Sequence, residues 1–149
     1  MKAFAIKKIN MDKCAKEKQI RVKKFNTQLS IIDGEEFSYV EIGNPLKSNC
    51  IYEINNINLK LKKDNKLSLS IGEGILKRSI TKELETNIIW QVADDDSMEV
   101  LSSSMHKGKF ISILDNYSII LIPGGSIFLK TMKPIDEMML DMEWIEELF

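Results

Sequence analysis

The sequence contains 149 residues, a length that suits one globular domain. Hydrophobic residues make up 44% and charged residues 29%, as in soluble globular proteins, and 3 Pro and 7 Gly are too few for a collagen-like or low-complexity chain. The net charge of −1 indicates no class of partner by itself, and the apolar run at residues 119–122 is too short for a transmembrane helix. We therefore expect a single soluble domain spanning residues 1–149.

Alternation of apolar and polar residues, which is typical of half-buried strands, dominates the first half of the chain. It predicts strands at residues 3–9, 19–25, 28–32, 37–42 and 50–54. Residues 57–61 and 67–71 show the clearest alternation, and Asp64 and Asn65 between them favour a turn. We expect these two segments to pair as an antiparallel hairpin.

Helical spacing interrupts this pattern in the middle of the chain. Apolar residues recur every four positions in residues 75–85 and predict a helix, and a strand is expected at 87–92. Met98, Leu101 and Met105 form one stripe and predict a second helix over residues 97–106. His106 would place a cation at the end of that helix, and Gly108 would stop it.

A three-stranded β-meander is predicted for residues 109–132, with strands at 110–114, 117–122 and 126–130. Asp115 and Asn116 favour the first turn, and Pro123, Gly124 and Gly125 favour the second. Residues 118–122 are apolar on both faces, so we expect this segment to be the central strand of the meander.

The last segment is predicted to be a helix over about residues 134–149. Pro134 suits the first helical turn, and the apolar stripe consists of Ile135, Met138, Met142, Ile145 and Phe149. We expect Met138, Met142 and Ile145 to be buried and Trp144 to face outward. The elements together predict a β-rich α+β fold, an antiparallel barrel or strongly bent sheet with short helical insertions and this C-terminal helix.

Charge is unevenly distributed along the chain. Residues 1–24 hold nine basic and two acidic side chains, whereas residues 134–149 hold six acidic and no basic ones. Such poles attract each other within a fold or steer a charged partner. Nucleic-acid binding through the basic strands is therefore the alternative function. Its candidate contacts are Lys7, Lys8, Arg21, Lys23 and Lys24. Its candidate aromatic platforms are Phe4, Phe25, Phe37, Tyr39 and Tyr52.

Catalytic signatures are scarce in this sequence. The single histidine, His106, has a ready structural role, and the glycines match neither a P-loop nor a dinucleotide fingerprint. Asp94, Asp95 and Asp96 with Glu99 form the one dense carboxylate cluster, and a metal-dependent enzyme built on them is a third hypothesis. A solvated turn that caps a helix is the favoured interpretation of the cluster, so we expect no metal or other cofactor, and no signature in the sequence supports an enzyme.

The remaining features favour binding to another protein. Cys14 and Cys50 lack metal-site spacing, and two thiols without an export signal are typical of the cytoplasm. The leading hypothesis is a non-catalytic cytoplasmic protein-binding or inhibitory module, such as an adaptor, an immunity protein or a phage-type regulator. A short acidic helix with aromatic anchors can dock into a groove of a partner, whereas the favoured alternative is that this helix only covers an open end or face of the sheet. The predicted anchors are Trp144, Ile145, Leu148 and Phe149. The oligomeric state is not predicted.

Overall fold

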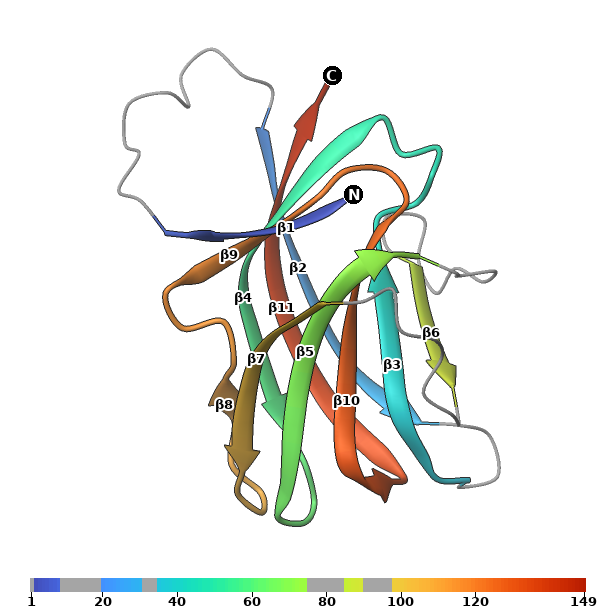
Figure 1. The fold of residues 1–149 in the computed structure, drawn as a ribbon, viewed down its shortest axis with the longest axis vertical. Helices are drawn as coiled ribbons and strands as arrows, with labels where there is room; N and C mark the ends of the chain where they lie inside the picture. The colour runs from blue at the N-terminus through green and yellow to red at the C-terminus, as the bar shows by residue number, and fades with distance from the viewer. Residues whose placement is uncertain (1, 9–19, 31–34, 75–84, 90–97) are drawn as a thin grey trace.

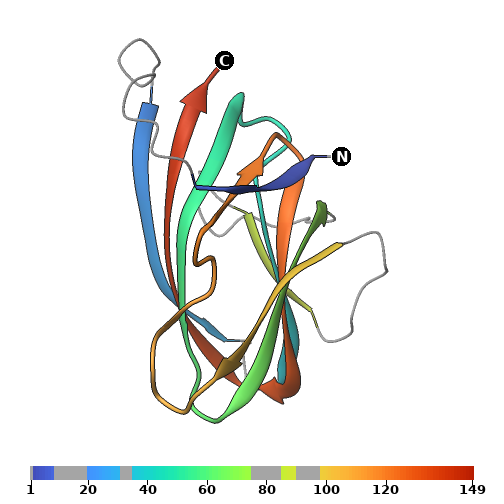
Figure 2. The ribbon, with the colours of Figure 1, turned by 60° about the vertical axis from the view of Figure 1, so that its left-hand side comes forward.

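The computed structural model describes residues 2–8, 20–30, 35–74, 85–89 and 98–149. These residues form two antiparallel β-sheets that face each other, and they contain no helix (Figures 1 and 2). The described part of the chain accordingly holds no helix able to span a membrane.

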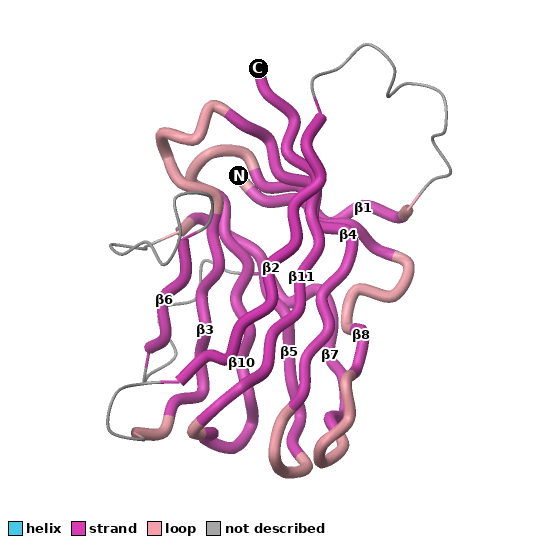
Figure 3. Tube along the Cα trace, turned by 180° about the vertical axis from the view of Figure 1, so that it is seen from behind, coloured by secondary structure: helices cyan, strands magenta, loops and turns pink. Residues whose placement is uncertain are grey.

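The first sheet, sheet A, lies nearest the viewer in Figure 3. Its strand order is β1-β9-β4-β11-β2, with the short β8 also beside β4. The strands are β1 (Ala3–Lys7), β2 (Ile20–Ser30), β4 (Cys50–Lys60), β8 (Ile111–Ser112), β9 (Tyr117–Leu121) and β11 (Glu137–Leu148). At the end where the C-terminus lies, β2, β4 and β11 extend past the other sheet (Figure 1).

The second sheet, sheet B, has the order β6-β3-β10-β5-β7. Its strands are β3 (Phe37–Gly43), β5 (Asn65–Glu73), β6 (Glu85–Ile89), β7 (Met98–Met105) and β10 (Gly125–Ile135). Both sheets have unpaired edges in the described chain, β1 and β2 in sheet A and β6 and β7 in sheet B. The prediction of an α+β barrel or a single bent sheet is therefore wrong, and the observed fold is an all-β sandwich of two open sheets.

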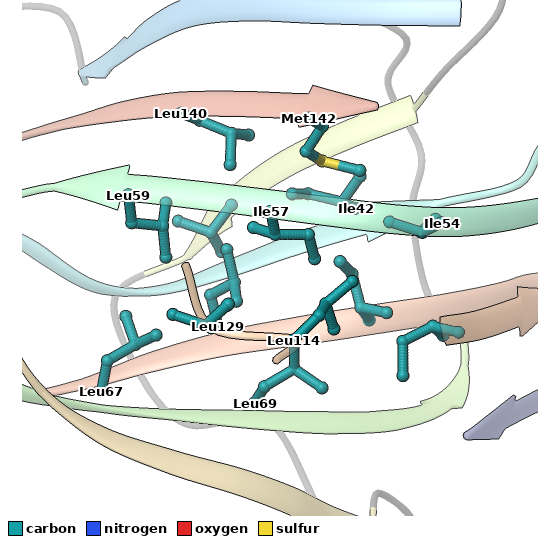
Figure 4. Close-up of a cluster of buried hydrophobic side chains, with 14 of the residues drawn as sticks. Ile42, Ile54, Ile57, Leu59, Leu67, Leu69, Leu114, Leu129, Leu140 and Met142 are labelled. Carbon is teal, nitrogen blue, oxygen red and sulfur yellow. The ribbon is translucent and has the colours of Figure 1, made fainter. Parts of the chain in front are cut away.

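The core fills the space between the sheets and follows from period-2 alternation. Along a regular strand every second side chain points inward, and β4 keeps this pattern on either side of an irregularity between Ile54 and Asn56, so two facing sheets bury one set of apolar residues. Figure 4 shows this interdigitation. From sheet A come Ile54, Ile57, Leu59, Leu140 and Met142, and from sheet B come Ile42, Leu67, Leu69 and Leu129, each 0–2% exposed. Leu114, which follows β8, closes the cluster from the side.

The predicted C-terminal helix is wrong, because residues 137–148 form β11. Its inner side chains Met138, Leu140, Met142 and Trp144 are 1–2% exposed. The segment also fits a helical stripe, because Met139 and Ile145 on the outer face of the strand are apolar as well. Pairing decides between the two patterns: β11 bonds to β2 along one side and to β4 along the other, which satisfies backbone groups on both sides of the strand.

The predicted helix over residues 97–106 is also wrong, because Met98–Met105 form β7 on the edge of sheet B. His106 lies in the exposed turn after this strand rather than at a helix end. The predicted helix over residues 75–85 falls outside the described residues, except for Glu85, which begins β6.

The strands of the predicted hairpin and meander exist, but their pairings were wrong. Residues 57–61 lie largely in β4 of sheet A and 67–71 in β5 of sheet B, so the turn crosses the sandwich. The meander is likewise divided, because β9 belongs to sheet A and β10 to sheet B. The crossing uses Gly124, with φ of 90°, and Gly125, where an added Cβ would lie 2.0 Å from the Lys2 carbonyl oxygen. The glycines are thus required for a close backbone approach between sheets.

Shortening a core side chain of β11 tests this packing. Met142→Ala should lower the free energy of unfolding by about 2–5 kcal/mol, because it leaves a cavity beside Ile57. Met132→Ala is the matched control, since Met132 is 61% exposed and its truncation should change stability by less than about 0.5 kcal/mol. Urea unfolding followed by circular dichroism measures both. Equal losses in the two variants would contradict the core position of Met142.

Candidate functional site

The outer face of sheet A carries a row of side chains that crosses all five main strands. In antiparallel pairs, residues directly opposite each other share one face of the sheet. The pairings Val22 to Ile145, Ile145 to Glu53, Glu53 to Ile120, and Ile120 to Phe4 are each in register. These five residues form the outer row.

The outer row lies in solvent, although four of its five members are apolar. Val22 is 60% exposed and Phe4 40%, and Ile120 and Ile145 are half-buried. Three further apolar side chains lie beside the row on the same face: Ile6 (43% exposed) on β1, Ile20 on β2 and Ile51 on β4. We call the outer row and these three residues the outer patch. Single exposed apolar residues are ordinary, but a contiguous group across five strands indicates an interaction surface.

The charges within and beside the outer patch are mainly negative. Glu53 occupies the middle of the outer row, Glu147 lies between Ile51 and Ile20, and Glu143 lies between Asn56 and Lys24. Three carboxylates and one ammonium give these described rows a net charge of −2. Glu53 makes no ion pair or hydrogen bond through its side chain with another described residue. The face therefore combines exposed apolar area with an available carboxylate.

A buried polar cluster supports the same end of sheet A from inside. The Glu146 carboxylate is 3% exposed and lies 3.3 Å from the Arg21 guanidinium. The indole Nε1–H of Trp144 donates to the other carboxylate oxygen at 3.3 Å. Trp144 also packs against Tyr52 and edge-on against Phe25. This cluster joins β2, β11 and β4 beneath the outer row and holds them in register.

The structure separates the four predicted anchors. Trp144 is 2% exposed in the core, so the prediction that it faces outward is wrong. Ile145 lies in the outer row, on the opposite face of β11. Leu148 and Phe149 are 38% and 73% exposed at the end of the chain. The four side chains thus form no common helical face, and Ile145 alone belongs to the patch described above.

The residues predicted to bind nucleic acid are also divided. Lys7 ends β1 and Lys8 follows it, whereas Arg21, Lys23 and Lys24 lie on β2, and β1 and β2 are the two opposite edge strands of sheet A. Of the predicted aromatic platforms, Phe37, Tyr39 and Tyr52 are buried, Phe25 packs on Trp144, and Phe4 is exposed. No stacking surface beside a basic strip results among these residues.

The structure describes only one of the four carboxylates of the metal hypothesis. Asp94, Asp95 and Asp96 fall outside the described residues, and Glu99 is exposed on β7. Within the described ranges, no three His, Cys, Asp or Glu side chains are grouped as metal ligands would be. Cys50 is a buried free thiol beside Arg21.

A cavity of about 510 Å³ lies at the end of the sandwich opposite the C-terminus. It is lined by charged residues of both signs, among them Lys62, Asp64, Lys133, Asp136 and Glu137. Desolvation opposes the charged form of Lys62, but the carboxylates of Asp136 and Glu137, 3.5 and 3.4 Å away, raise the pKa of this lysine above its ordinary value. The Asn65 amide is occupied by backbone groups of Lys66 and Lys133. The side chains of Lys62, Asp64, Asn65, Asp136 and Glu137 are thus already engaged within the fold.

Comparison with protein-family models, curated proteins and solved structures found no match to this chain. The outer face of sheet A therefore has to be interpreted from its own chemistry. The outer row was missed in the sequence because its members come from five separate segments that only the strand register brings together.

The position of Trp144 can be tested by fluorescence. In a Trp90→Phe background, which removes the second tryptophan, Trp144 should emit at short wavelength and resist quenching by acrylamide, because its ring is enclosed by Tyr52 and Phe25. Emission and quenching like those of free tryptophan would contradict the β11 register.

The buried carboxylate can be tested by stability. Glu146→Ala should cost about 1–3 kcal/mol, because the Trp144 indole N–H loses its acceptor inside the core. Glu143→Ala, on the outer face of the same strand, is the control and should change stability by less than about 0.5 kcal/mol. Chemical unfolding measures both, and a neutral Glu146→Ala would show that the cluster does not stabilise the fold.

Proposed function

We propose that this protein is a non-catalytic, cytoplasmic protein-binding module of the adaptor or inhibitor kind, and that the outer patch of sheet A is its binding surface. The observation that carries the proposal is the outer row: four apolar side chains from four strands are held in one exposed line by the register of sheet A. Burying such a line against a partner removes apolar area from water, which contributes about 25 cal/mol of favourable binding free energy per Å².

The charge of the face favours a protein over nucleic acid or lipid. Phosphate backbones and anionic bilayer surfaces are bound through lysine and arginine clusters, whereas Glu53, Glu143 and Glu147 place carboxylates beside the patch. Sheet geometry also suits a protein partner, because an exposed sheet face can pack against a helix or another sheet.

The experiment compares capture by matched surface variants. The wild-type chain, a Val22→Ser/Ile145→Ser variant and a Met132→Ser/Leu46→Ser variant are immobilised and exposed to lysate of the native host. Met132 and Leu46 are 61% and 71% exposed and lie outside the outer patch, so they control for the loss of apolar area. We expect one protein to be retained by the wild type and the control and to be lost from the outer-patch variant. Hydrogen exchange of the purified pair should then show protection on β2, β4, β9 and β11. Equal retention by all three baits, or no retained protein, would contradict the proposal.

A further inference from the structure

We propose that the partner surface presents a lysine or arginine, flanked by apolar side chains, that pairs with Glu53. This inference rests on the proposed function, because it concerns the chemistry of whatever covers the outer patch. It follows from the place of Glu53, which stands third in a row of five residues with Ile145 on one side and Ile120 on the other.

A partner that covers the neighbours of Glu53 must also cover its carboxylate. Any surface that covers Ile145 and Ile120 also covers the residue between them, so Glu53 loses water when its neighbours do. Burying an unpaired carboxylate is strongly unfavourable, whereas a buried, hydrogen-bonded ion pair removes that penalty. Within the described part of the chain no residue supplies a cation for this role, because none forms an ion pair with Glu53.

The surrounding charges select the sign of the partner. Glu143 and Glu147 lie on β11 on the same face as Glu53, and Lys24 is the cation of these rows, opposite Glu143 on the β2 side. A cationic partner is thus attracted by the whole face and held by its central carboxylate. A second copy of this chain is disfavoured as the occupant, because two patches related by a two-fold axis through the row would bring Glu53 against Glu53.

Glu146, in contrast to Glu53, is a carboxylate whose charge is compensated within the fold. Glu146 lies on the inner face of β11 and is held by Arg21 and by the Trp144 indole. Glu53 lies on the outer face of the adjacent strand and has no such contacts. We infer that the partner supplies to Glu53 a cation as Arg21, itself 53% exposed, supplies one to Glu146.

The experiment uses short random peptides displayed on phage. Peptides are selected on the wild-type chain after depletion on the Val22→Ser/Ile145→Ser variant, so that retained sequences depend on the outer patch. We expect them to carry a lysine or arginine between apolar residues. Binding of a selected peptide should weaken about 30-fold or more with Glu53→Gln, and Glu73→Gln, an exposed carboxylate of β5, is the matched control. Glu53→Lys should restore binding when the basic residue of the peptide is replaced by glutamate.

The outcomes separate the two proposals. Patch-dependent peptides without a basic residue, or peptides unaffected by Glu53→Gln, would overturn the pairing with Glu53 and leave the binding surface supported. Failure to recover any peptide that depends on Val22 and Ile145 would overturn both. Dimerisation of the wild type that Val22→Ser/Ile145→Ser abolishes, seen by sedimentation, would assign the patch to a second copy and also overturn the pairing.

Discussion

The pairing of β11 on both of its sides is the interaction on which sheet A depends. Residues 137–147 pair with β2 in one continuous register, and residues 139–148 pair with β4 with a register shift between Glu143 and Trp144. Without β11, the edge strand β2 would have no neighbour in the described chain, and the inner face would lose Met138, Leu140, Met142 and Trp144. The same strand also sets the register of the outer face, since Ile145 joins Val22 to Glu53. Core and surface are therefore fixed by one set of backbone hydrogen bonds.

Electrostatics agrees with this pairing. The acidic end of the chain and the basic β2 are neighbours, and Glu143 opposite Lys24 and Glu146 beside Arg21 place opposite charges together. Each exposed pair contributes little to stability, but opposite charges across a strand pair favour this arrangement over alternatives. Lysine and arginine on β2 also discourage further strands from adding to its open edge. The separation of basic and acidic segments along the sequence thus favours the pairing of β2 with β11 within the fold, whatever its effect on a partner.

The positions of most strands could be predicted from alternation, whereas their pairing could not. A turn such as residues 61–64 looks the same in sequence whether it joins neighbours in one sheet or crosses between two. Here both flanking strands direct apolar side chains inward, which suits two facing sheets as well as one hairpin. Pro123, Gly124 and Gly125 are predicted to form a turn. The contact that requires a glycine at position 125, however, is made by the backbone of Lys2, which is far away in sequence. The outer row depends on register across five strands and has no local signal at all.

The prediction of a helix over residues 134–149 is wrong for a local reason, which is a change in the apolar pattern of β11 near its C-terminal end. A strand with one buried face should be apolar inward and polar outward, and β11 follows this pattern up to Trp144 except at Met139, which is apolar on the outer face. It then reverses, because Ile145 faces solvent and Glu146 faces the core. The reversal places an apolar residue where a helical stripe needs one. Reversing the pattern costs stability at both positions, and Arg21 and the Trp144 indole offset part of that cost only at Glu146. Local disagreement with the pattern that specifies a fold is characteristic of functional positions, and Ile145 lies in the outer row between Val22 and Glu53, on the face that we propose as the binding surface.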